Sequence, residues 1–225
     1  MFISETFASI QGEGMLAGVP SFFIRTSGCN LRCRWCDTPY TSWVPEGSRR
    51  SVEDLANEAV ASGLQHVVVT GGEPLLQREI GDLTEWLKKV DRHITVETAG
   101  TVSPAFDCDL LSVSPKTANS DPPGTARSRH RQLRKERDPL RSLVRRFPDH
   151  QLKFVIEDAD DLPEVQSVLK SIGGIEPSRV LLMAQGRTAL EVAQRAPGIA
   201  ALCLEHGFRY TPRLHLDLFG GGRGV

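Results

Sequence analysis

Cys29-Asn-Leu-Arg-Cys33-Arg-Trp-Cys36 places three cysteines on one short stretch, and Asp37-Thr38 follows at once. Thiolates are the usual protein ligands of iron–sulfur clusters, and four of them normally hold a cluster that contains four irons. Three thiolates leave the fourth iron without a protein ligand, so that iron can bind a substrate or a cofactor. The stretch therefore predicts a 4Fe-4S cluster with one open iron, held by Cys29, Cys33 and Cys36.

Zinc and disulfides are the alternatives for these cysteines. A zinc site usually takes four ligands, often from two separated Cys pairs, and the chain has no second pair. Cys108 and Cys203 stand alone in apolar stretches and are expected in the core. Five cysteines without a secretion signal favour a reducing, cytoplasmic compartment, where cysteines tend toward metal or catalytic roles. A disulfide framework is therefore disfavoured.

The bulk properties are those of an ordinary globular domain. The chain has 225 residues, 40% of them hydrophobic, and a formal net charge of −1. This balance gives no support for a protein that binds nucleic acid over its whole surface. The first residues lack the basic start and apolar run of a signal peptide, and no stretch approaches the roughly 18 apolar residues of a membrane span. We expect one domain over residues 1–225.

Apolar strand-like runs alternate with amphipathic helical stretches. Strands are expected at 22–24, 66–70, 94–98, 110–114, 153–156, 180–183 and 208–210, and helices from Ser51 and over 75–90, 140–147, about 162–172 and about 189–206. This order predicts a mostly parallel sheet with helical crossovers. The helices are too few for a complete eight-fold barrel of about 250 residues. The predicted fold is therefore α/β, a partial, open TIM-like (β/α) barrel with its sites at the carboxyl ends of the strands.

One segment breaks the alternation. Residues 117–139 are rich in Ser, Pro, Gly, Arg and Lys, and nine basic residues stand between Arg127 and Arg146 against Glu136 and Asp138. The plainer interpretation is a solvated, mobile basic loop inserted at about 117–139, which leads into the helix at 140–147. The sharper interpretation is a basic lid or an arm that docks a partner.

Three motifs stand at the ends of predicted strands. Thr70-Gly71-Gly72-Glu73-Pro74 follows the apolar run of residues 67–69. Its two glycines let a ligand approach the backbone, and a backbone edge together with Glu73 can accept from an ammonium group. Glu97-Thr98-Ala99-Gly100 and Ser114-Pro115-Lys116 end the next two strands. In a parallel sheet these ends lie along one rim, which predicts a shared binding site.

The C-x3-C-x2-C spacing together with the Gly-Gly-Glu-Pro turn resembles the radical S-adenosylmethionine (SAM) superfamily. In that family the open iron chelates the amino and carboxylate groups of SAM, and one electron splits the sulfonium to release a 5′-deoxyadenosyl radical. The resemblance places the methionyl amino group at the turn, the ribose and carboxylate at the next strand ends, and adenine near 183–186. The implied SAM contacts are Gly72, Glu73, Glu97, Ser114, Pro115, Lys116, Met183, Ala184, Gln185 and Gly186. Many relatives have Asn at the position of Ala99.

The N-terminal segments ETFASIQGEG (5–14) and GVPSFFIR (18–25) resemble the 7-carboxy-7-deazaguanine synthases (QueE). This resemblance extends through the motifs above to residues 212–215 and 223–225, and omits only the basic insertion. It implies a carbon–nitrogen lyase that converts 6-carboxy-5,6,7,8-tetrahydropterin to 7-carboxy-7-deazaguanine with release of ammonia. SAM is regenerated, and the product serves the biosynthesis of queuosine and other 7-deazapurines.

The same resemblance implies a substrate site, a metal and partners. Arg25 suits bidentate pairing with the substrate carboxylate. Thr38 resembles the family's Mg²⁺ ligand, and magnesium prefers oxygen ligands. The implied substrate contacts are Ile10, Gln11, Gly12, Glu13, Arg25, Thr70 and Val225. The family is usually homodimeric and is reduced by a flavodoxin- or ferredoxin-type donor, with no direct contact to nucleic acid or membrane. His215 is expected to be structural rather than catalytic.

Two other functions remain open from the sequence. A glycyl-radical activase shares the cluster and SAM motifs, has a similar size and needs a protein partner, for which the basic segment offers a docking surface. The Gln11-Gly12-Glu13-Gly14 stretch together with Arg25 favours a small carboxylated heterocycle instead. A non-catalytic zinc- or cluster-binding module is the second alternative, and metal analysis separates it from the enzyme.

Overall fold

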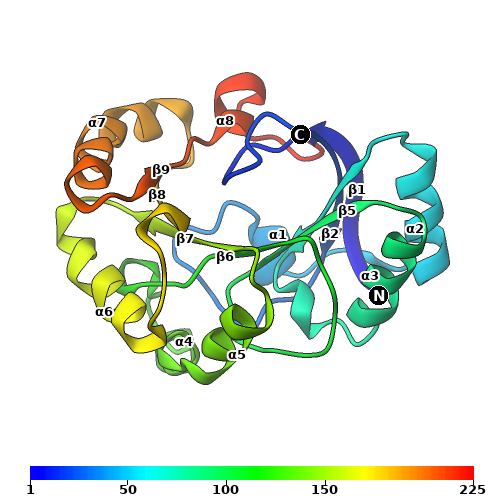
Figure 1. The fold of residues 1–225 in the computed structure, drawn as a ribbon, viewed down its shortest axis with the longest axis horizontal. Helices are drawn as coiled ribbons and strands as arrows, with labels where there is room; N and C mark the ends of the chain where they lie inside the picture. The colour runs from blue at the N-terminus through cyan, green and yellow to red at the C-terminus, as the bar shows by residue number, and fades with distance from the viewer.

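Nine strands form one curved sheet in the computed structural model, which describes residues 1–225 (Figure 1). The order across the sheet is β3-β1-β2-β4-β5-β6-β7-β8-β9. β1 runs antiparallel to β2 and β3, and every neighbouring pair from β2 to β9 is parallel. The strands are β1 Phe2–Ile10, β2 Pro20–Thr26, β3 Ser48–Arg49, β4 His66–Gly71, β5 His93–Thr98, β6 Leu110–Val113, β7 His150–Ile156, β8 Val180–Ala184 and β9 Arg209–Tyr210.

The longer helices lie outside the curved sheet, as parallel crossovers require (Figure 1). They are α2 Val52–Ala61, α3 Ile80–Lys89, α4 Ala126–Lys135, α5 Asp138–Arg146, α6 Leu162–Ile172 and α7 Ala189–His206. Two short helices, α1 Pro39–Ser42 and α8 Leu214–Phe219, follow the loops after β2 and β9. The helix at Ser51 begins as predicted, because the Asp54 N–H donates to the Ser51 hydroxyl at 3.0 Å. None of the helices has both the length and the apolar composition of a membrane span.

The sheet stays open, because its two edge strands, β3 and β9, do not pair with each other. The loop after β1 and the C-terminal segment lie between these edges (Figure 1). The Leu214 N–H donates to the Gly12 carbonyl at 3.0 Å, and the Gly14 N–H donates to the Thr211 hydroxyl at 2.6 Å. The prediction of a partial, open barrel is confirmed.

A single cluster of 34 buried side chains forms the core between the sheet and its helices. The strands read as near-continuous apolar runs because both faces of a parallel sheet are covered. Val67, Val68 and Val69 of β4 are completely buried. Cys108 and Cys203 belong to this cluster, which confirms their predicted place in the core.

The helix expected over residues 75–90 is shorter than predicted. A 3-10 turn, η1 (Pro74–Leu76), comes first, and α3 begins only at Ile80. Gln77 between them is extended, which interrupts the helical path. Leu76 of η1 and Trp86 of α3 are 42% and 36% exposed, so these two apolar side chains lie outside the core. Strand β1 was not expected from the pattern at all.

The prediction of a mobile loop at 117–139 was wrong, because α4 occupies Ala126–Lys135. Two of its polar side chains, His130 and Arg134, are buried. Arg134 forms ion pairs with Asp121 at 2.6 Å and Glu164 at 2.5 Å. These partners lie outside the helix. A count of charges within the segment could not include them, and it therefore predicted a solvated loop where tertiary ion pairs stabilise a helix.

His66 provides a test of the folded core at low pH. It is 4% exposed, with Nδ1 2.6 Å from the Ser21 hydroxyl and Nε2 2.7 Å from the Thr95 hydroxyl. Burial, assisted by nearby His93 and opposed by Asp109, lowers the pKa of His66 to about 4. The unfolded pKa is near 6.5, so the stability that neutral His66 provides is complete above that pH and is lost as the pH falls toward 4.

We expect His66→Gln to remove part of this pH dependence. Between pH 7 and pH 5 the wild type should lose about 2 kcal/mol of unfolding free energy through this group, and the variant should lack that loss. Urea denaturation of both apoproteins at the two pH values measures it. Other buried histidines titrate in both proteins alike, so equal losses in the two would contradict the assignment to His66.

Candidate active site

A cavity of about 560 Å³ opens among the cysteine loop, the strand ends and the C-terminal segment. This volume falls within the range of small-molecule sites. Most residues predicted from the sequence line it: Ile10, Gln11, Gly12, Glu13, Arg25, Cys29, Cys33, Cys36, Thr38, Thr70, Gly72, Glu97, Ser114, Lys116, Met183, Gln185, Gly186 and Val225. Glu73, Pro115 and Ala184 do not line it.

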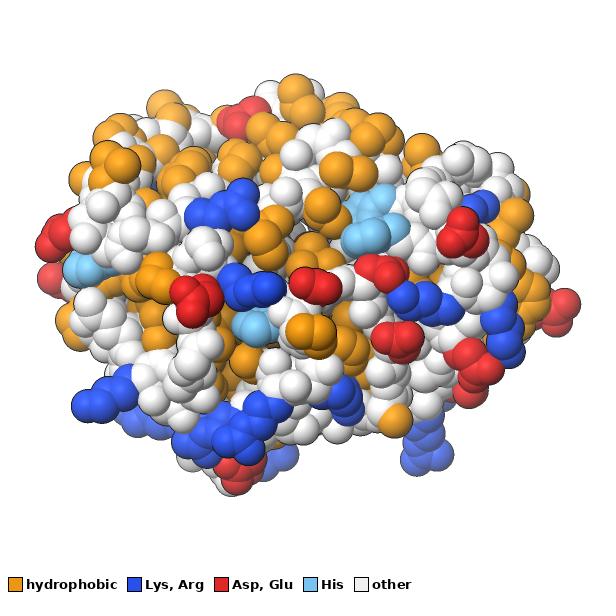
Figure 2. Space-filling model, viewed as in Figure 1, with side chains coloured by type: hydrophobic (Ala, Val, Ile, Leu, Met, Phe, Trp, Pro, Cys, Tyr) orange, Lys and Arg blue, Asp and Glu red, His pale blue; other side chains and the backbone are white.

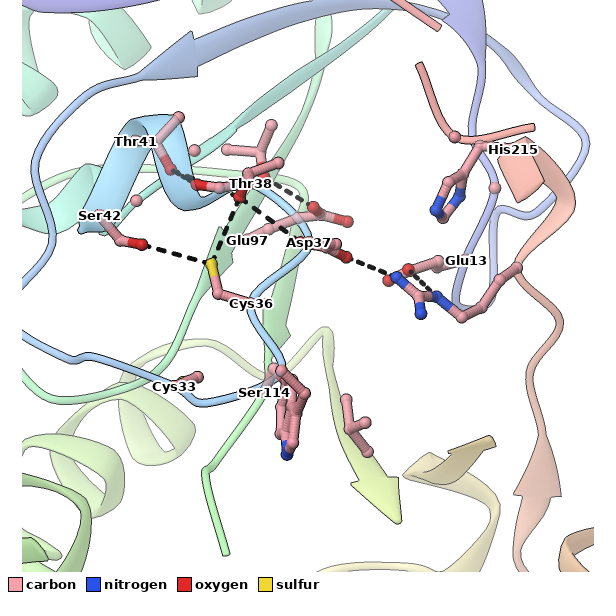
Figure 3. Close-up of a pocket in the computed structure, with 18 of the residues that line it drawn as sticks. Glu13, Cys33, Cys36, Asp37, Thr38, Thr41, Ser42, Glu97, Ser114 and His215 are labelled. Atoms are coloured by element: carbon pink, nitrogen blue, oxygen red, sulfur yellow. Dashed lines mark hydrogen bonds and ion pairs between the residues drawn. The ribbon is translucent and has the colours of Figure 1, made fainter. Parts of the chain in front are cut away.

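The three cysteines lie on the loop between β2 and α1, and all three are free thiols facing the same cavity. Burial raises the pKa of both Cys29 and Cys33 to about 12. The Ser42 hydroxyl lies 3.3 Å from the Cys36 sulfur (Figure 3). Three free thiols on one wall fit three corners of an iron–sulfur cluster, and binding the iron releases their protons.

The glycine turn after β4 packs directly on the cysteine loop. The Glu73 N–H donates to the Gly28 carbonyl at 2.9 Å. A Cβ added at Gly72 would stand 2.3 Å from that carbonyl oxygen and 2.7 Å from the carbonyl oxygen of Thr41. Gly71 has a φ of +129°, which other residues rarely adopt. Only glycines therefore allow the turn and the cysteine loop to approach this closely.

The Glu73 side chain points into the protein, against the expectation that it meets the SAM ammonium group. It is completely buried, and its carboxylate accepts from the Leu75 N–H at 3.1 Å, the Thr98 hydroxyl at 2.7 Å and the Ala99 N–H at 2.8 Å. Burial raises its pKa, while these hydrogen bonds oppose the shift. Glu73 therefore joins the β4 turn to the end of β5, and the backbone of the turn is left to face the cavity.

Arg25 presents part of its guanidinium to the cavity. Its Nε donates to the Glu5 carboxylate at 2.7 Å, and the Tyr40 hydroxyl donates to the same oxygen at 2.8 Å. The guanidinium also lies over the Phe7 ring, 5.1 Å from its centroid. No protein acceptor contacts its two terminal nitrogens, so a fixed guanidinium keeps a free pair of donors.

The C-terminal segment is held beside the same tyrosine. The Arg223 guanidinium lies 3.8 Å from the centroid of the Tyr40 ring, and its Nη2 is 2.8 Å from the Glu46 carboxylate. Gly221, Gly222 and Val225 line the cavity. Tyr40 thus contacts both the segment that ends at Val225 and the carboxylate that orients Arg25.

Lys153 and Glu13 form a buried ion pair on the cavity wall. Lys153 Nζ bonds the Glu13 carboxylate and lies 3.7 Å from Glu97, and Arg213 Nε lies 3.3 Å from Glu13. Burial favours the neutral acid, but the charges of Lys153 and Arg213 outweigh it and hold the pKa of Glu13 well below its usual range. The cavity therefore contains a carboxylate that is ionised at neutral pH.

Two predicted substrate contacts, Gln11 and Thr70, use their side chains for hydrogen bonds to other residues of the protein. The Gln11 amide donates to Glu97 at 3.3 Å and accepts from the Glu13 N–H at 3.1 Å. The Thr70 hydroxyl donates to the other oxygen of Glu97 at 2.9 Å. Both residues line the cavity, and their side chains hold the Glu97 carboxylate near the end of β5.

Two other side-chain oxygens lie near the Thr38 hydroxyl. Its hydroxyl lies 3.5 Å from the Asp37 carboxylate and 3.4 Å from the Thr41 hydroxyl. Burial acts to raise the pKa of Asp37, but nearby positive charges, chiefly the Arg213 guanidinium 2.5 Å away, together lower that pKa overall. Figure 3 shows Asp37 pointing from Thr38 toward Glu13 and His215, and potential ligand atoms of these three residues lie within 4.8 Å of one another.

Sequence reasoning gave no site role to several polar residues that line the cavity, among them Asp37, Tyr40, Lys153, Arg213 and His215. Asp37 directly follows the last cysteine, and Lys153 is the only charged residue in the otherwise apolar centre of β7; both were visible signals. Tyr40 gave none, because its partners are distant in sequence. Arg213 lies in the stretch 212–215 that carries the family resemblance, but no role was assigned to it there. His215, expected to be structural, lies on the cavity wall.

Comparisons with known proteins agree with this geometry. The family model of the radical SAM superfamily matches residues 23–156. The chain is 43% identical to a 7-carboxy-7-deazaguanine synthase from Rhodopirellula baltica, over 100% of this chain and 89% of that protein. It is 45% identical to one from Halobacterium salinarum, over 96% and 90%. QueE from Escherichia coli has a similar fold, with a TM-score of 0.70, 24% identity and coverage of 93% of this chain and 92% of that one.

These similarities bear on the alternatives. The similarity to these relatives covers nearly the whole chain, including the N-terminal segments 5–14 and 18–25, which are not part of the cluster or SAM motifs. The glycyl-radical activase alternative is therefore not favoured. The superfamily match over the cysteine loop also disfavours a non-catalytic zinc module.

Proposed function

The chain belongs to the 7-carboxy-7-deazaguanine synthases, a lyase family of the radical SAM superfamily, and we propose that its cavity converts 6-carboxy-5,6,7,8-tetrahydropterin to 7-carboxy-7-deazaguanine and ammonia. It is a radical SAM enzyme of 7-deazapurine biosynthesis. When bound, the cluster and SAM supply a 5′-deoxyadenosyl radical that takes a hydrogen atom from the substrate, and SAM is regenerated at the end of the reaction. The protein contributes placement, charge and exclusion of water.

Cys29, Cys33 and Cys36 would hold the cluster, and the backbone of Gly71 and Gly72 would receive the methionyl ammonium group. Lys116 would pair with the methionyl carboxylate, since its ammonium group lies on this wall, 2.7 Å from the Ser114 hydroxyl. Met183, Gln185 and Gly186 would surround adenine at the end of β8. Glu73 has no direct contact in this proposal, because its carboxylate is already occupied.

The observation that carries the substrate assignment is the free pair of Arg25 donors in the cavity that the cysteines line. A planar guanidinium can pair bidentately with a carboxylate. Because Glu5 already holds the Arg25 side chain in place, binding should cost little side-chain conformational entropy. The ionised Glu13 suits the opposite edge of a pterin, which presents N–H donors. Arg25 and Glu13 together would orient a carboxylated pterin between them.

Magnesium is part of the proposal. The Thr38 hydroxyl, with the Asp37 carboxylate beside it, supplies oxygen ligands at the edge of the cysteine loop. Magnesium keeps several waters and is often shared between one or two protein oxygens and the substrate. Thr38 would therefore provide one ligand, and substrate oxygens would complete the shell.

We also propose a homodimer, a flavodoxin- or ferredoxin-type electron donor and a cytoplasmic location. Exposed apolar side chains on α7 and α8, namely Leu204, Leu218 and Phe219, support a self-association surface. Figure 2 shows apolar side chains gathered near α8 at the upper edge of this face. A reducing compartment is consistent with five free cysteines.

The function is tested with anaerobically reconstituted protein, SAM, dithionite, Mg²⁺ and 6-carboxytetrahydropterin. We expect 7-carboxy-7-deazaguanine by mass spectrometry, and no product from Cys33→Ala, which should also lack the iron–sulfur absorbance. A wild-type protein that has a full cluster and cleaves SAM but forms no product would refute the proposed substrate.

Arg25→Ala should keep the cluster and weaken substrate binding. Removing one half of a buried charge pair costs roughly 2–5 kcal/mol, so the substrate Kd should rise by more than tenfold. Equilibrium binding of the pterin to the SAM-loaded, unreduced enzyme measures this without turnover.

Tyr40→Phe is the matched control for Arg25→Ala. It keeps the ring under Arg223 and the guanidinium itself, and removes only the hydrogen bond to Glu5, which is worth about 0.5–1.5 kcal/mol. Its effect on substrate Kd should therefore be smaller than that of Arg25→Ala. Wild-type affinity in Arg25→Ala would exclude Arg25 as the carboxylate partner.

Thr38→Val should raise the Mg²⁺ concentration that gives half-maximal activity, on the order of tenfold or more, because the variant lacks a ligand oxygen. Thr38→Ser keeps the hydroxyl and should stay near the wild type. Titration of activity with Mg²⁺ at saturating substrate gives the comparison. The same half-maximal concentration in all three proteins would count against Thr38 as a ligand.

A further inference from the structure

Helix α4 packs directly against the cysteine loop. His130, 1% exposed, accepts from the Arg32 N–H through Nδ1 at 3.0 Å, and its Nε2 lies 2.9 Å from the Ser120 hydroxyl. The Arg34 N–H donates to the Ser120 carbonyl at 3.0 Å. The helix is thus fixed to the backbone on both sides of Cys33. Any protein bound on α4 is held next to the loop that carries the cluster ligands.

The charge of this part of the chain departs from the rest. Residues 126–146 contain nine Arg and Lys and two acidic residues. This leaves 18 of the 27 basic and 26 of the 28 acidic residues for the remainder, so a nearly neutral protein has one strongly cationic segment. Figure 2 shows Lys and Arg side chains gathered along the lower edge, where Figure 1 places α4 and α5.

The basic residues of α4 divide into two groups. Arg134 is buried and paired with Asp121 and Glu164, and therefore stabilises the fold. Arg127, Arg129, Arg131 and Lys135 are exposed, and we call these four the basic face. Asp121 lies 3.9 Å from Arg127 and 3.3 Å from Arg131 and partly offsets them. Arg129 and Lys135 have no ion-pair partner, so their charges are fully available to a partner protein.

We infer that the basic face of α4 is the docking surface for an acidic one-electron carrier protein that reduces the cluster. This rests on the proposed function, since SAM cleavage consumes one electron that the substrate does not supply. A flavodoxin hydroquinone would give one electron to the oxidised cluster and become a semiquinone, which balances the step. Opposite charges on the two surfaces speed encounter and favour one orientation.

The position of the basic face favours an electron carrier over nucleic acid. His130 of the helix contacts the cysteine loop and Ser120, so a carrier bound on the helix lies close to the cluster ligands, and electron transfer requires such a short distance. The remainder of the surface is net acidic, which disfavours a polyanion that extends beyond one helix. A compact acidic protein is confined to the cationic area.

The test compares two reductants on charge-reversed holoenzymes. Arg129→Glu/Lys135→Glu reverses the two unpaired charges and spares His130, Arg134 and the cavity. Arg78→Glu/Arg209→Glu is the matched control and changes the net charge by the same amount. Arg78 lies just before α3 and Arg209 lies in β9, and both are exposed and form no ion pair. Iron content and circular dichroism establish that each variant is folded and loaded.

With flavodoxin hydroquinone at low ionic strength and without the pterin, so that SAM is not regenerated, SAM cleavage by the α4 variant should be slower than wild type by about tenfold or more. The difference should shrink as salt is added, because exposed charges are screened. The control pair should stay near the wild type, and with dithionite all three proteins should react alike. Equal flavodoxin-driven rates in the α4 variant and the wild type would overturn the proposal.

A second measurement separates this inference from the function it rests on. Dithionite-driven product formation reports the proposed function alone, so its absence in the wild type refutes the function rather than the docking surface. Fluorescence anisotropy with a transfer RNA at physiological salt addresses the other partner class. RNA binding that is lost in the α4 variant, together with unchanged flavodoxin-driven rates, would assign the basic face to RNA and overturn the carrier proposal.

Discussion

The close contact between the Gly71–Gly72 turn and the cysteine loop is the constraint on which the site depends. A side chain at Gly72 would collide with carbonyl oxygens of Gly28 and Thr41, at the two ends of that loop. The turn thereby holds the three thiols against the end of β4, and Glu73, buried behind it, ties the turn to β5. Cofactor placement thus depends on backbone packing that no other residue type permits.

Ion pairs around the cavity are the second feature on which the site depends. Two sets of ion pairs border the cavity: Arg25 with Glu5, and Lys153 and Arg213 with Glu13. Each ion is paired, which keeps the cost of burial low while leaving selected groups free for ligands. The free donors of Arg25 and the ionised Glu13 face one cavity, so a small carboxylated heterocycle is favoured over a protein substrate. Tyr40 links this network to the C-terminal segment.

The basic helix α4 also combines paired charges that stabilise the fold with unpaired charges that are free to bind a partner. His130 and Arg134 turn inward and fix the helix, while Arg129 and Lys135 remain exposed. One segment thereby stabilises the cysteine loop and presents charge beside it. Its charge density is what made it look like a solvated loop in the sequence, because a local count cannot distinguish an Arg paired with Asp121 and Glu164 from one in water.

The sequence by itself determined the parallel α/β order and the family, and it supplied the cysteine triplet that we propose as the cluster ligands, because these depend on local spacing, apolar periodicity and contiguous motifs. Cys29, Cys33 and Cys36 could be proposed from their spacing alone, and the interior strands followed from runs such as Val67–Val69. Only the tertiary structure decided the direction of Glu73, the engagement of Gln11 and Thr70 with Glu97, and the helix at 126–135. Those outcomes depend on which distant donors and charges the fold brings within hydrogen-bond range, and neither periodicity nor a short motif contains that information.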